Sequence, residues 1–278
     1  MNQKQIWNKN SQEDIIKNLI NLLEKSVKKK IPKEKFGLLL SGGLDSSILA
    51  VLLKKLDCNF ICYVVEFHHP SFKKADDIKY SKLIAKKLGL KLKIVKVNIK
   101  QVKAVLPKII NLIKTDNVPM VSIALAIYFC MKQASSEKVK TILYDCALDC
   151  VFAGLHKHRA VKNLKRACIE SLEKTYKIDL PRDTKIAKHF KINLKSPFLD
   201  KELTSFALAL PSKYKIHKGI NKYILRKTAL ELGLPKSIAL RKKRAIQYSS
   251  NSQKIIKKLA KQNNFKKMSD YLESLNHD

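Results

Sequence analysis

The sequence predicts an α/β fold with a doubly wound parallel sheet, followed by a helical C-terminal half. Between residues 36 and 150, short apolar runs alternate with segments of 3.6-residue apolar periodicity. That alternation is typical of parallel strands whose two faces are covered by helices. Beyond residue 150 only helical patterns are visible. Hydrophobic residues make up 45% of the 278 residues, which is enough for a packed core and excludes wholesale disorder.

The first predicted element, within residues 1–30, is an amphipathic N-terminal helix. Ser11 and Asp14 form a typical helix start, and Ile15, Leu19 and Leu23 belong to one apolar stripe. The helix ends in a run of three lysines at 28–30, just before a proline.

Residues 31–156 are predicted to form the α/β core. We expect strands at 36–40, 60–65, 92–97 and 139–144 and helices at 46–56, 76–88, 102–113 and 119–133. The apolar run at 118–131 contains Pro119 and Ser122 and is too short to cross a bilayer, so we expect a buried core helix there.

The remaining residues, 157–278, are predicted to form a helical region that completes the site. Helical patterns occur at 157–177, 200–209, 221–232 and 252–275, and prolines at 181, 197, 211 and 235 separate them. No strand is expected after residue 150.

The net charge is +34, which would normally indicate a polyanionic partner. However, 51 of the basic residues are lysines and only six are arginines, the residue that base and phosphate readers prefer. We interpret most of the charge as compositional bias: a nucleic-acid partner is possible but not favoured, and no membrane partner is expected.

The cysteines and the first residues indicate a cytoplasmic protein. Six cysteines are scattered along a chain whose residues 1–5 contain no apolar leader, so we expect reduced thiols. Asn2 follows Met1, where an N-terminal-nucleophile amidohydrolase would have Cys, Ser or Thr, and that activity is not expected in this chain.

A glycine turn joins the first predicted strand to its helix and reads Ser41-Gly42-Gly43-Leu44-Asp45-Ser46-Ser47. At the carboxyl end of a parallel strand, such a turn lets the backbone approach an anion, and the helix N-terminus supplies N–H groups. Asp45 would repel a phosphate by itself, which indicates a bridging Mg²⁺. The alternative is a structural turn whose serines cap the helix, but the full set of hydroxyl and carboxyl groups favours a phosphate site.

This turn resembles the pyrophosphate loop of the ATP pyrophosphatase superfamily, and specifically of the synthetase domain of asparagine synthetases. Further similar elements follow in the family's order: Arg182-Asp183, Pro197-Phe198-Leu199-Asp200, the Lys-x-x-Leu-Arg pattern from Lys222 to Arg226, Leu234-Pro235, and Arg241-Lys242-Lys243. The resemblance covers roughly residues 30–250 and does not include the family's glutaminase domain. It implies an adenine nucleotide alpha hydrolase-like fold.

The resemblance also implies a reaction. ATP would activate a carboxylate, normally that of aspartate, as an acyl-adenylate, pyrophosphate would leave, and ammonia or another amine would attack. The nitrogen would come from free ammonia, a separate glutaminase subunit or the substrate itself. The implied residues are Lys222, Asp149 and Arg226 as catalytic groups, Asp45 and Asp149 as Mg²⁺ ligands, and Ser41, Gly42, Gly43, Asp45, Ser46, Ser47, Lys242 and Lys243 as ATP-binding groups.

Structural alternatives accompany several of these assignments. Lys222 is one of 51 lysines and could be a solvated helix residue, and the run 241–244 could be a solvated face. Asp200 and the pair Arg182-Asp183 could be helix caps or buried ion pairs.

The family pattern breaks at residues 145–150. Asp149, Phe152 and Gly154 match the family, but Cys146 and Cys150 occupy its two glutamate positions, and both glycines of that loop are absent. A thiol cannot replace a carboxylate as a hard Mg²⁺ ligand, so we hypothesise that Asp145 compensates. Downstream, Asn193 and Lys195 replace a Glu and an Arg of the family. The family's nucleotide-binding elements are therefore better matched in this sequence than the elements that handle aspartate and ammonia.

The cysteines suggest a rival function. Cys130, Cys146 and Cys150 could hold an iron–sulfur cluster or a persulfide in a tRNA-modifying enzyme, although we favour small buried apolar residues. His68, His69, His156 and His158 are expected to be solvated rather than ligands. A second rival is a nucleotide-binding partner subunit that has lost turnover.

Overall fold

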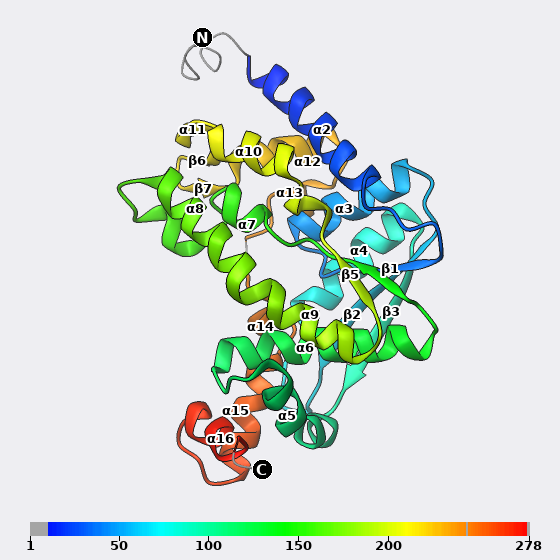
Figure 1. Ribbon diagram of the computed structural model, residues 1–278, viewed down its shortest axis with the longest axis vertical. Helices are drawn as coiled ribbons and strands as arrows, with labels where there is room; N and C mark the ends of the chain where they lie inside the picture. Colours follow the sequence, from blue (N-terminus) through cyan, green and yellow to red (C-terminus); the bar gives the residue numbers. More distant parts are fainter. Residues whose placement is uncertain (1–10, 243, 277–278) are drawn as a thin grey trace.

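The computed structural model describes residues 11–276 except residue 243, and it is built around one parallel sheet (Figure 1). The strand order is β3-β2-β1-β4-β5, and every neighbouring pair is parallel. The strands are β1 (Phe36–Leu39), β2 (Phe60–Phe67), β3 (Lys91–Val97), β4 (Thr141–Leu143) and β5 (Asn193–Lys195). A separate antiparallel pair is formed by β6 (Ile216–His217) and β7 (Ile220–Asn221).

Helices cover both faces of the sheet. The longer helices are α2 (Gln12–Lys28), α3 (Leu44–Lys55), α4 (Asp76–Leu88), α5 (Ile99–Ile113), α6 (Val118–Ser136), α8 (Leu164–Lys174), α9 (Leu180–His189), α10 (Lys201–Ala209), α12 (Tyr223–Glu231) and α15 (Ser252–Gln262). The shorter ones are α7 (Leu148–Val151), α11 (Ser212–Lys215), α13 (Lys236–Ala239), α14 (Ile246–Ser249), α16 (Met268–Ser274), η1 (His156–Arg159), η2 (Thr175–Asp179) and η3 (Pro197–Leu199).

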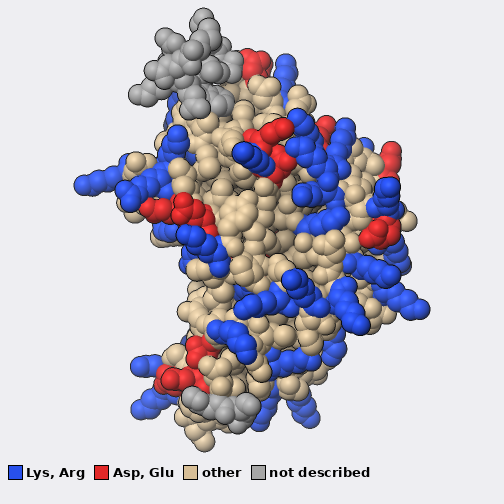
Figure 2. All heavy atoms as spheres, viewed as in Figure 1, with Lys and Arg blue, Asp and Glu red and all other residues tan. Residues whose placement is uncertain are grey.

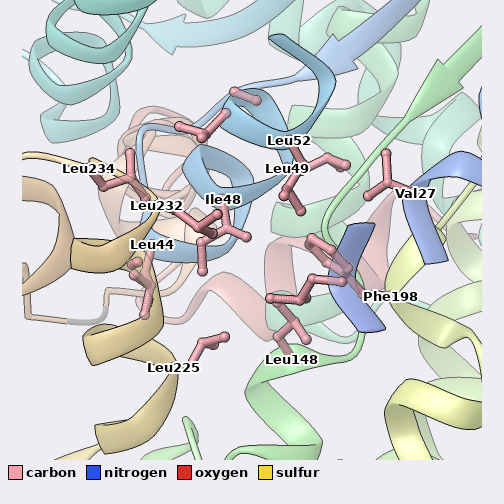
Figure 3. Close-up of a cluster of buried hydrophobic side chains, with 14 of the residues drawn as sticks. Val27, Leu44, Ile48, Leu49, Leu52, Leu148, Phe198, Leu225, Leu232 and Leu234 are labelled. Carbon is pink, nitrogen blue, oxygen red and sulfur yellow. The ribbon is translucent and has the colours of Figure 1, made fainter. Parts of the chain in front are cut away.

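Two hydrophobic clusters hold these layers together. One joins α2, α3, α4, α7, α10 and α12 on one face of the sheet, and the other joins α5, α6, α9, α15 and α16 on the opposite face. Figure 3 shows part of the first cluster, where Leu44 at the start of α3 and Leu148 at the start of α7 take part in the same packing. This shared core fixes the starts of both helices beneath the candidate site.

The predicted doubly wound α/β fold is confirmed, and so is the predicted core helix. Helix α6 is 19 residues long and packs against α5, α9, α15 and β2. It is the one helix among residues 11–276, leaving aside residue 243, that is long and apolar enough to cross a membrane, and 61% of its most apolar window is buried inside the protein.

The expectation that no strand follows residue 150 is wrong. Strand β5 pairs with β4 in parallel at the sheet edge, with Leu194 opposite Ile142. It has only three residues, and two of them are Asn193 and Lys195, so no apolar alternation marks it in the sequence. Its place in the sheet comes from pairing with a buried neighbour.

The helix expected at 157–177 is also wrong in its bounds. A 3-10 turn at 156–159 comes first, α8 follows, and a π-helical turn at 175–179 leads into α9. Pro181 therefore does not separate two helices. Proline is tolerated in the first turn of α9 because an N–H there needs no partner within that helix.

The helix expected at 252–275 is two helices, α15 and α16. They are separated by residues 263–267, where Asn264 has a positive φ of 63°. Phe265 lies between them and packs against the second cluster, so the break is stabilised by burial of an aromatic side chain.

The predicted N-terminal region, residues 1–30, is described from residue 11 onward. Its helix α2 packs against α3, α10 and α12, and residues 1–10 lie outside the described part.

Candidate active site

The turn between β1 and α3 has the geometry of an anion-binding loop. Gly42 has φ of +66°, and a Cβ there would overlap the backbone of Tyr80 and Ser81. Gly43 is the N-cap of α3 and donates its N–H to Ser41 Oγ (3.2 Å), while no side chain caps the helix. The first N–H groups of α3 therefore face the pocket lined by Gly43, Leu44 and Asp45.

The serines of this turn differ in their surroundings. Ser41 Oγ lies 3.1 Å from Ser46 Oγ, and Ser46 Oγ also donates to the Gly43 carbonyl at 3.3 Å. Ser47 is fully buried, and its Oγ has no hydrogen-bond partner among the described residues. Ser41 lines the pocket, whereas Ser46 and Ser47 lie beneath it.

Lys222 is brought from the distant part of the chain into the centre of the site. It is the N-cap of α12, has a left-handed φ of 57° and is 2% exposed. Its Nζ lies 2.5 Å from Asp45 Oδ2 and 2.6 Å from Asp149 Oδ1. One ammonium therefore links the phosphate-type loop to the loop after β4, and the alternative of a solvated lysine is wrong.

Gly154 leaves the space that this arrangement needs. A Cβ at residue 154 would overlap the Cε atom of Lys222 and the carboxylate of Asp149. The short helix α7 presents Asp149, and the chain then bends so that the Gly154 N–H donates to the Asp149 carbonyl at 2.7 Å. The Lys222–Asp149 pair depends on a glycine at this position.

The loop at 145–150 contains no glycine, but one of its residues has a backbone conformation that is typical of glycine. Ala147 has φ of 98°, a value that strains any side chain and that glycine adopts freely. Asp145 lines the same pocket as Asp45 and Lys222. The Cys146 carbonyl accepts a hydrogen bond from Ser196 Oγ (3.1 Å), which anchors the loop to the residue after β5.

Three basic side chains from the segment after α13 also line the pocket. The guanidinium of Arg241 stacks over the Tyr80 ring, 4.0 Å from its centroid, and lies 3.2 Å from Asp77 Oδ1. Arg244 forms an ion pair with Asp76, and Lys242 is exposed and lines the pocket. Arg241 is therefore held in place rather than solvated, and Lys243 lies outside the described residues.

Arg226 is buried next to this basic segment. It donates to the carbonyls of Asn221 (2.8 Å), Ala239 (2.6 Å) and Arg241 (3.0 Å), and burial lowers the pKa of its guanidinium. These bonds tie the start of α12 to the basic segment after α13. Arg226 lines the pocket, but its geometry is that of a group that positions Lys222 and Arg241.

Asp77 is a site residue that the sequence reasoning missed. It is 3% exposed, lies in the first turn of α4, pairs with Arg241 and accepts a hydrogen bond from Ser249 Oγ (2.9 Å). Its sequence signal is the pair Asp76-Asp77 at a helix start after β2, a pattern that is also typical of ordinary capping.

Asp200 and the pair Arg182-Asp183 form the helix cap and ion pairs that their structural alternative predicted. Asp200 caps α10 by accepting from the N–H groups of Glu202 and Leu203, and it pairs with Lys29. Arg182 donates to Asp183 Oδ1 at 2.6 Å, and both side chains are about 95% buried.

Four of the six cysteines are buried, and Cys58 and Cys146 are half-buried. Burial raises the pKa of Cys130 to about 12 and that of Cys150 to about 11, and raises the pKa of Cys146 well above its ordinary value. Cys150 Sγ lies 3.2 Å from Thr175 Oγ1. Residues 11–276, residue 243 excepted, contain no group of three His, Cys, Asp or Glu side chains that could hold a metal.

His158 corrects another expectation. It is 1% exposed rather than solvated, and its Nε2 lies 3.0 Å from Ser171 Oγ. Burial lowers the pKa of its imidazole. The packing of η1 against α8 accompanies this burial, which the local sequence does not indicate.

The donor set is compatible with Mg²⁺ bound together with a nucleotide. Asp45 and Asp149 provide hard carboxylate oxygens that already share one cation, the Lys222 ammonium. Mg²⁺ in nucleotide sites is commonly held by one or two carboxylates together with substrate phosphates. Two carboxylates beside a helix N-terminus therefore satisfy the requirement without a complete protein cage.

Comparison with known proteins identifies the family. The family model described as asparagine synthase matches residues 18–168 and 157–274. A Methanocaldococcus jannaschii protein, named provisionally as a glutamine-hydrolysing asparagine synthetase, is 28% identical over 95% of this chain and 55% of its own length. The glutamine-hydrolysing asparagine synthetase of Bos taurus is 26% identical over 94% of this chain and 47% of its own length.

The chain thus spans about half the length of these relatives. Among solved structures, an NH₃-dependent NAD synthetase from Campylobacter jejuni is similar with a TM-score of 0.43 and 12% identity, covering 96% of this chain and 94% of its own. Because the family model covers nearly the whole chain, this protein belongs to the asparagine synthase family.

Proposed function

We propose that the chain is an ATP-dependent, Mg²⁺-requiring ligase that forms an amide through an acyl-adenylate. Aspartate is the proposed acyl substrate, and ammonia or another amine is the proposed nucleophile. The observation that carries the proposal is the buried Lys222 ammonium, which contacts Asp45 at the phosphate-type loop and Asp149 at the loop after β4. A cation held between a phosphate site and a second catalytic loop is suited to a reaction that joins a nucleotide to a substrate.

The charges of the pocket suit the departure of pyrophosphate. The N-terminus of α3 and the side chains of Arg241 and Lys242 surround the pocket from two sides. In a site with little water, preorganised N–H groups and cations stabilise negative charge that develops on the leaving group. When bound, Mg²⁺ would neutralise the phosphates from the side of Asp45 and Asp149.

Lys222 has the proposed central role. Its ammonium is positioned to neutralise the α-phosphate as the substrate carboxylate attacks phosphorus and the bond to pyrophosphate breaks. The amine then attacks the acyl carbonyl, AMP leaves, and the amine loses a proton. Arg226 is proposed to hold the start of α12, and with it Lys222, in position through its three backbone contacts.

The test is ATP–pyrophosphate exchange with and without L-aspartate. Exchange that requires aspartate and Mg²⁺ would support the full proposal. Exchange that is the same with and without aspartate contradicts aspartate as the acyl substrate but still supports the adenylation mechanism. ATP binding without pyrophosphate release under any amine and carboxylate would instead support a partner subunit that has lost turnover.

The Asp145→Asn variant tests the altered loop. Asp145 lines the same pocket as Asp45 and Lys222. If it replaces the lost glutamates, exchange should fall at least tenfold in the variant at saturating Mg²⁺. Undiminished turnover would remove Asp145 from the proposed site.

A further inference from the structure

Two helices in the lower lobe of the protein carry exposed lysines (Figure 1). Helices α5 and α15 pack against each other on one face of the sheet, and their apolar sides enter the second hydrophobic cluster. Their exposed sides carry Lys100, Lys103 and Lys108 on α5 and Lys254, Lys257 and Lys261 on α15. We refer to these six residues as the lysine surface.

Acidic residues are excluded from the segments that build this surface. No Asp or Glu occurs between Asp77 and Asp116 or between Glu231 and Asp270, and each of these stretches contains 11 basic residues. In Figure 2, blue side chains border the lower lobe, where Figure 1 places α5, α15 and α16, and red is confined to one small area.

The lysine surface differs from the lysine-rich end of α2. On α2, Lys25 and Lys29 form salt bridges with Glu202 and Asp200. None of the six lysines on α5 and α15 forms a salt bridge with any carboxylate that the structure describes. Exposed lysines on α4 (82, 86 and 87) likewise form no salt bridge with a described carboxylate, so the lysine surface is distinguished by the packing of two lysine-bearing helices beside a cavity.

A cavity of about 350 Å³ opens beside α15. Val118, Pro119 and Met268 give it apolar walls, and Lys257 and Lys261 of the lysine surface line it as well. Lys266 and Lys267 add two further positive charges to its lining. An apolar recess of this size surrounded by ammonium groups can accept a planar, uncharged group that is attached to a chain of negative charges.

We propose that the lysine surface and this cavity bind a single-stranded nucleic acid. The lysines neutralise successive backbone phosphates, and an unstacked base enters the cavity. Lysine acts on phosphate as a point charge, and contacts to phosphate carry no sequence information, so the binding is independent of sequence. This proposal does not depend on the ligase function.

An anionic membrane is the less favoured partner. Helices that lie on a membrane insert large apolar side chains beside their basic residues. The exposed large hydrophobic side chains of the described residues all lie outside α5 and α15. The apolar groups beside the lysines line a recess instead.

The test measures binding of the full chain to labelled 20-nucleotide oligo(U) RNA, to the matching DNA and to a duplex of the same length. With about six phosphate contacts, affinity for the single strand should fall roughly 10²- to 10³-fold between 50 and 200 mM salt. RNA and DNA single strands should bind more tightly than the duplex. Duplex binding as tight as single-strand binding would overturn the proposal.

Charge reversal locates the surface. The variant K254E/K257E/K261E should bind the single strand at least tenfold more weakly and with a shallower salt dependence. The control K82E/K86E/K87E changes the same charge on α4, on the opposite face of the sheet, and should lose less than threefold. Equal losses in the two variants, or binding to phosphatidylserine vesicles but not to RNA or DNA, would overturn the proposal.

The same variants separate this proposal from the ligase proposal. Neither triple variant touches the pocket around Lys222, so ATP–pyrophosphate exchange should be unchanged in both, which also shows that they fold. Loss of nucleic-acid binding with intact exchange supports the lysine surface. Absence of exchange in the unmodified chain leaves the binding comparison intact.

Discussion

The loop after β1 and the loop after β4 meet at one lysine but are built differently. The loop at 41–47 has the glycine, hydroxyl and carboxyl groups expected of a phosphate site, and its positive φ falls on Gly42. The loop at 145–150 also contains a positive φ, but it falls on Ala147, where it strains the backbone, and the loop contains thiols instead of further carboxylates. The first loop therefore combines suitable chemistry with relaxed geometry, whereas the second has the geometry but different chemistry.

The second loop shows how packing can fix the position of one carboxylate. The backbone of the second loop is fixed by Leu148 in the core and by the bond from Ser196 to the Cys146 carbonyl. Those constraints hold Asp149 against Lys222 even though the neighbouring side chains differ from the family pattern. Packing therefore preserves the position of one carboxylate while the rest of the loop varies.

Removing Lys222 should have the largest effect because its ammonium contacts a carboxylate of each loop. In Lys222→Ala, Asp45 and Asp149 lose their shared cation, and we expect exchange to fall at least 10²-fold. Lys227→Ala, an exposed lysine on the same helix, is the matched control and should retain activity. Lys222→Arg retains the charge and separates folding from catalysis: a well-folded, inactive protein supports the assignment, and full activity contradicts it.

The two glycines of the first loop should respond unequally. Gly42→Ala places a Cβ at φ +66° against the backbone of Tyr80, and we expect a loss of about 2 kcal/mol or more in unfolding free energy. Gly43 has φ of −73° and meets only Ser41 Oγ at 3.2 Å, so Gly43→Ala should cost less than about 1 kcal/mol. Urea denaturation of both variants measures the contrast, and equal losses would refute it.

The second loop should gain stability from a glycine. Ala147→Gly relieves a φ of 98°, and we expect the unfolding free energy to rise by about 1 kcal/mol. Ala160→Gly is the control, because Ala160 has φ of −110° and a glycine there only adds freedom to the unfolded chain. A loss of stability in Ala147→Gly would show that the turn is not strained.

The smallest effect concerns the histidine behind the second loop. Because burial lowers the pKa of His158 in the folded protein, the unfolded chain takes up a proton first as the pH falls below about 6.5. Stability should therefore decline with acidification through this range, and the decline should be weaker in His158→Asn. His156→Asn, at an exposed position in the same turn, should behave like the unmodified protein. Thermal melts between pH 5 and 8 measure this.

Local sequence signals were sufficient to predict those structural features that depend on a single short segment. The strand, glycine turn and helix around Gly42 are visible because each depends on neighbours within a few residues. The family resemblance added Lys222 and Asp149, and the structure brings both together with Asp45. No such signal marked β5, because a three-residue edge strand has too few side chains to show a period.

The remaining site features depend on contacts between distant segments. Arg241 is ordered because Tyr80 and Asp77 lie beneath it, more than 160 residues earlier in the chain. His158 is buried because α8 packs over it, and nothing adjacent in the sequence distinguishes it from the exposed His156. Pairings of this kind require three-dimensional positions.

By itself, the sequence determined the alternation of strands and helices, the phosphate-type turn and the excess of lysine. The tertiary structure decided how individual lysines differ, because Lys222 is desolvated between two carboxylates, whereas the lysines of α5 and α15 are exposed and form no salt bridge with a described carboxylate. The physical reason is that the effect of a charge depends on its burial and on the charges around it. Both are properties of the folded chain.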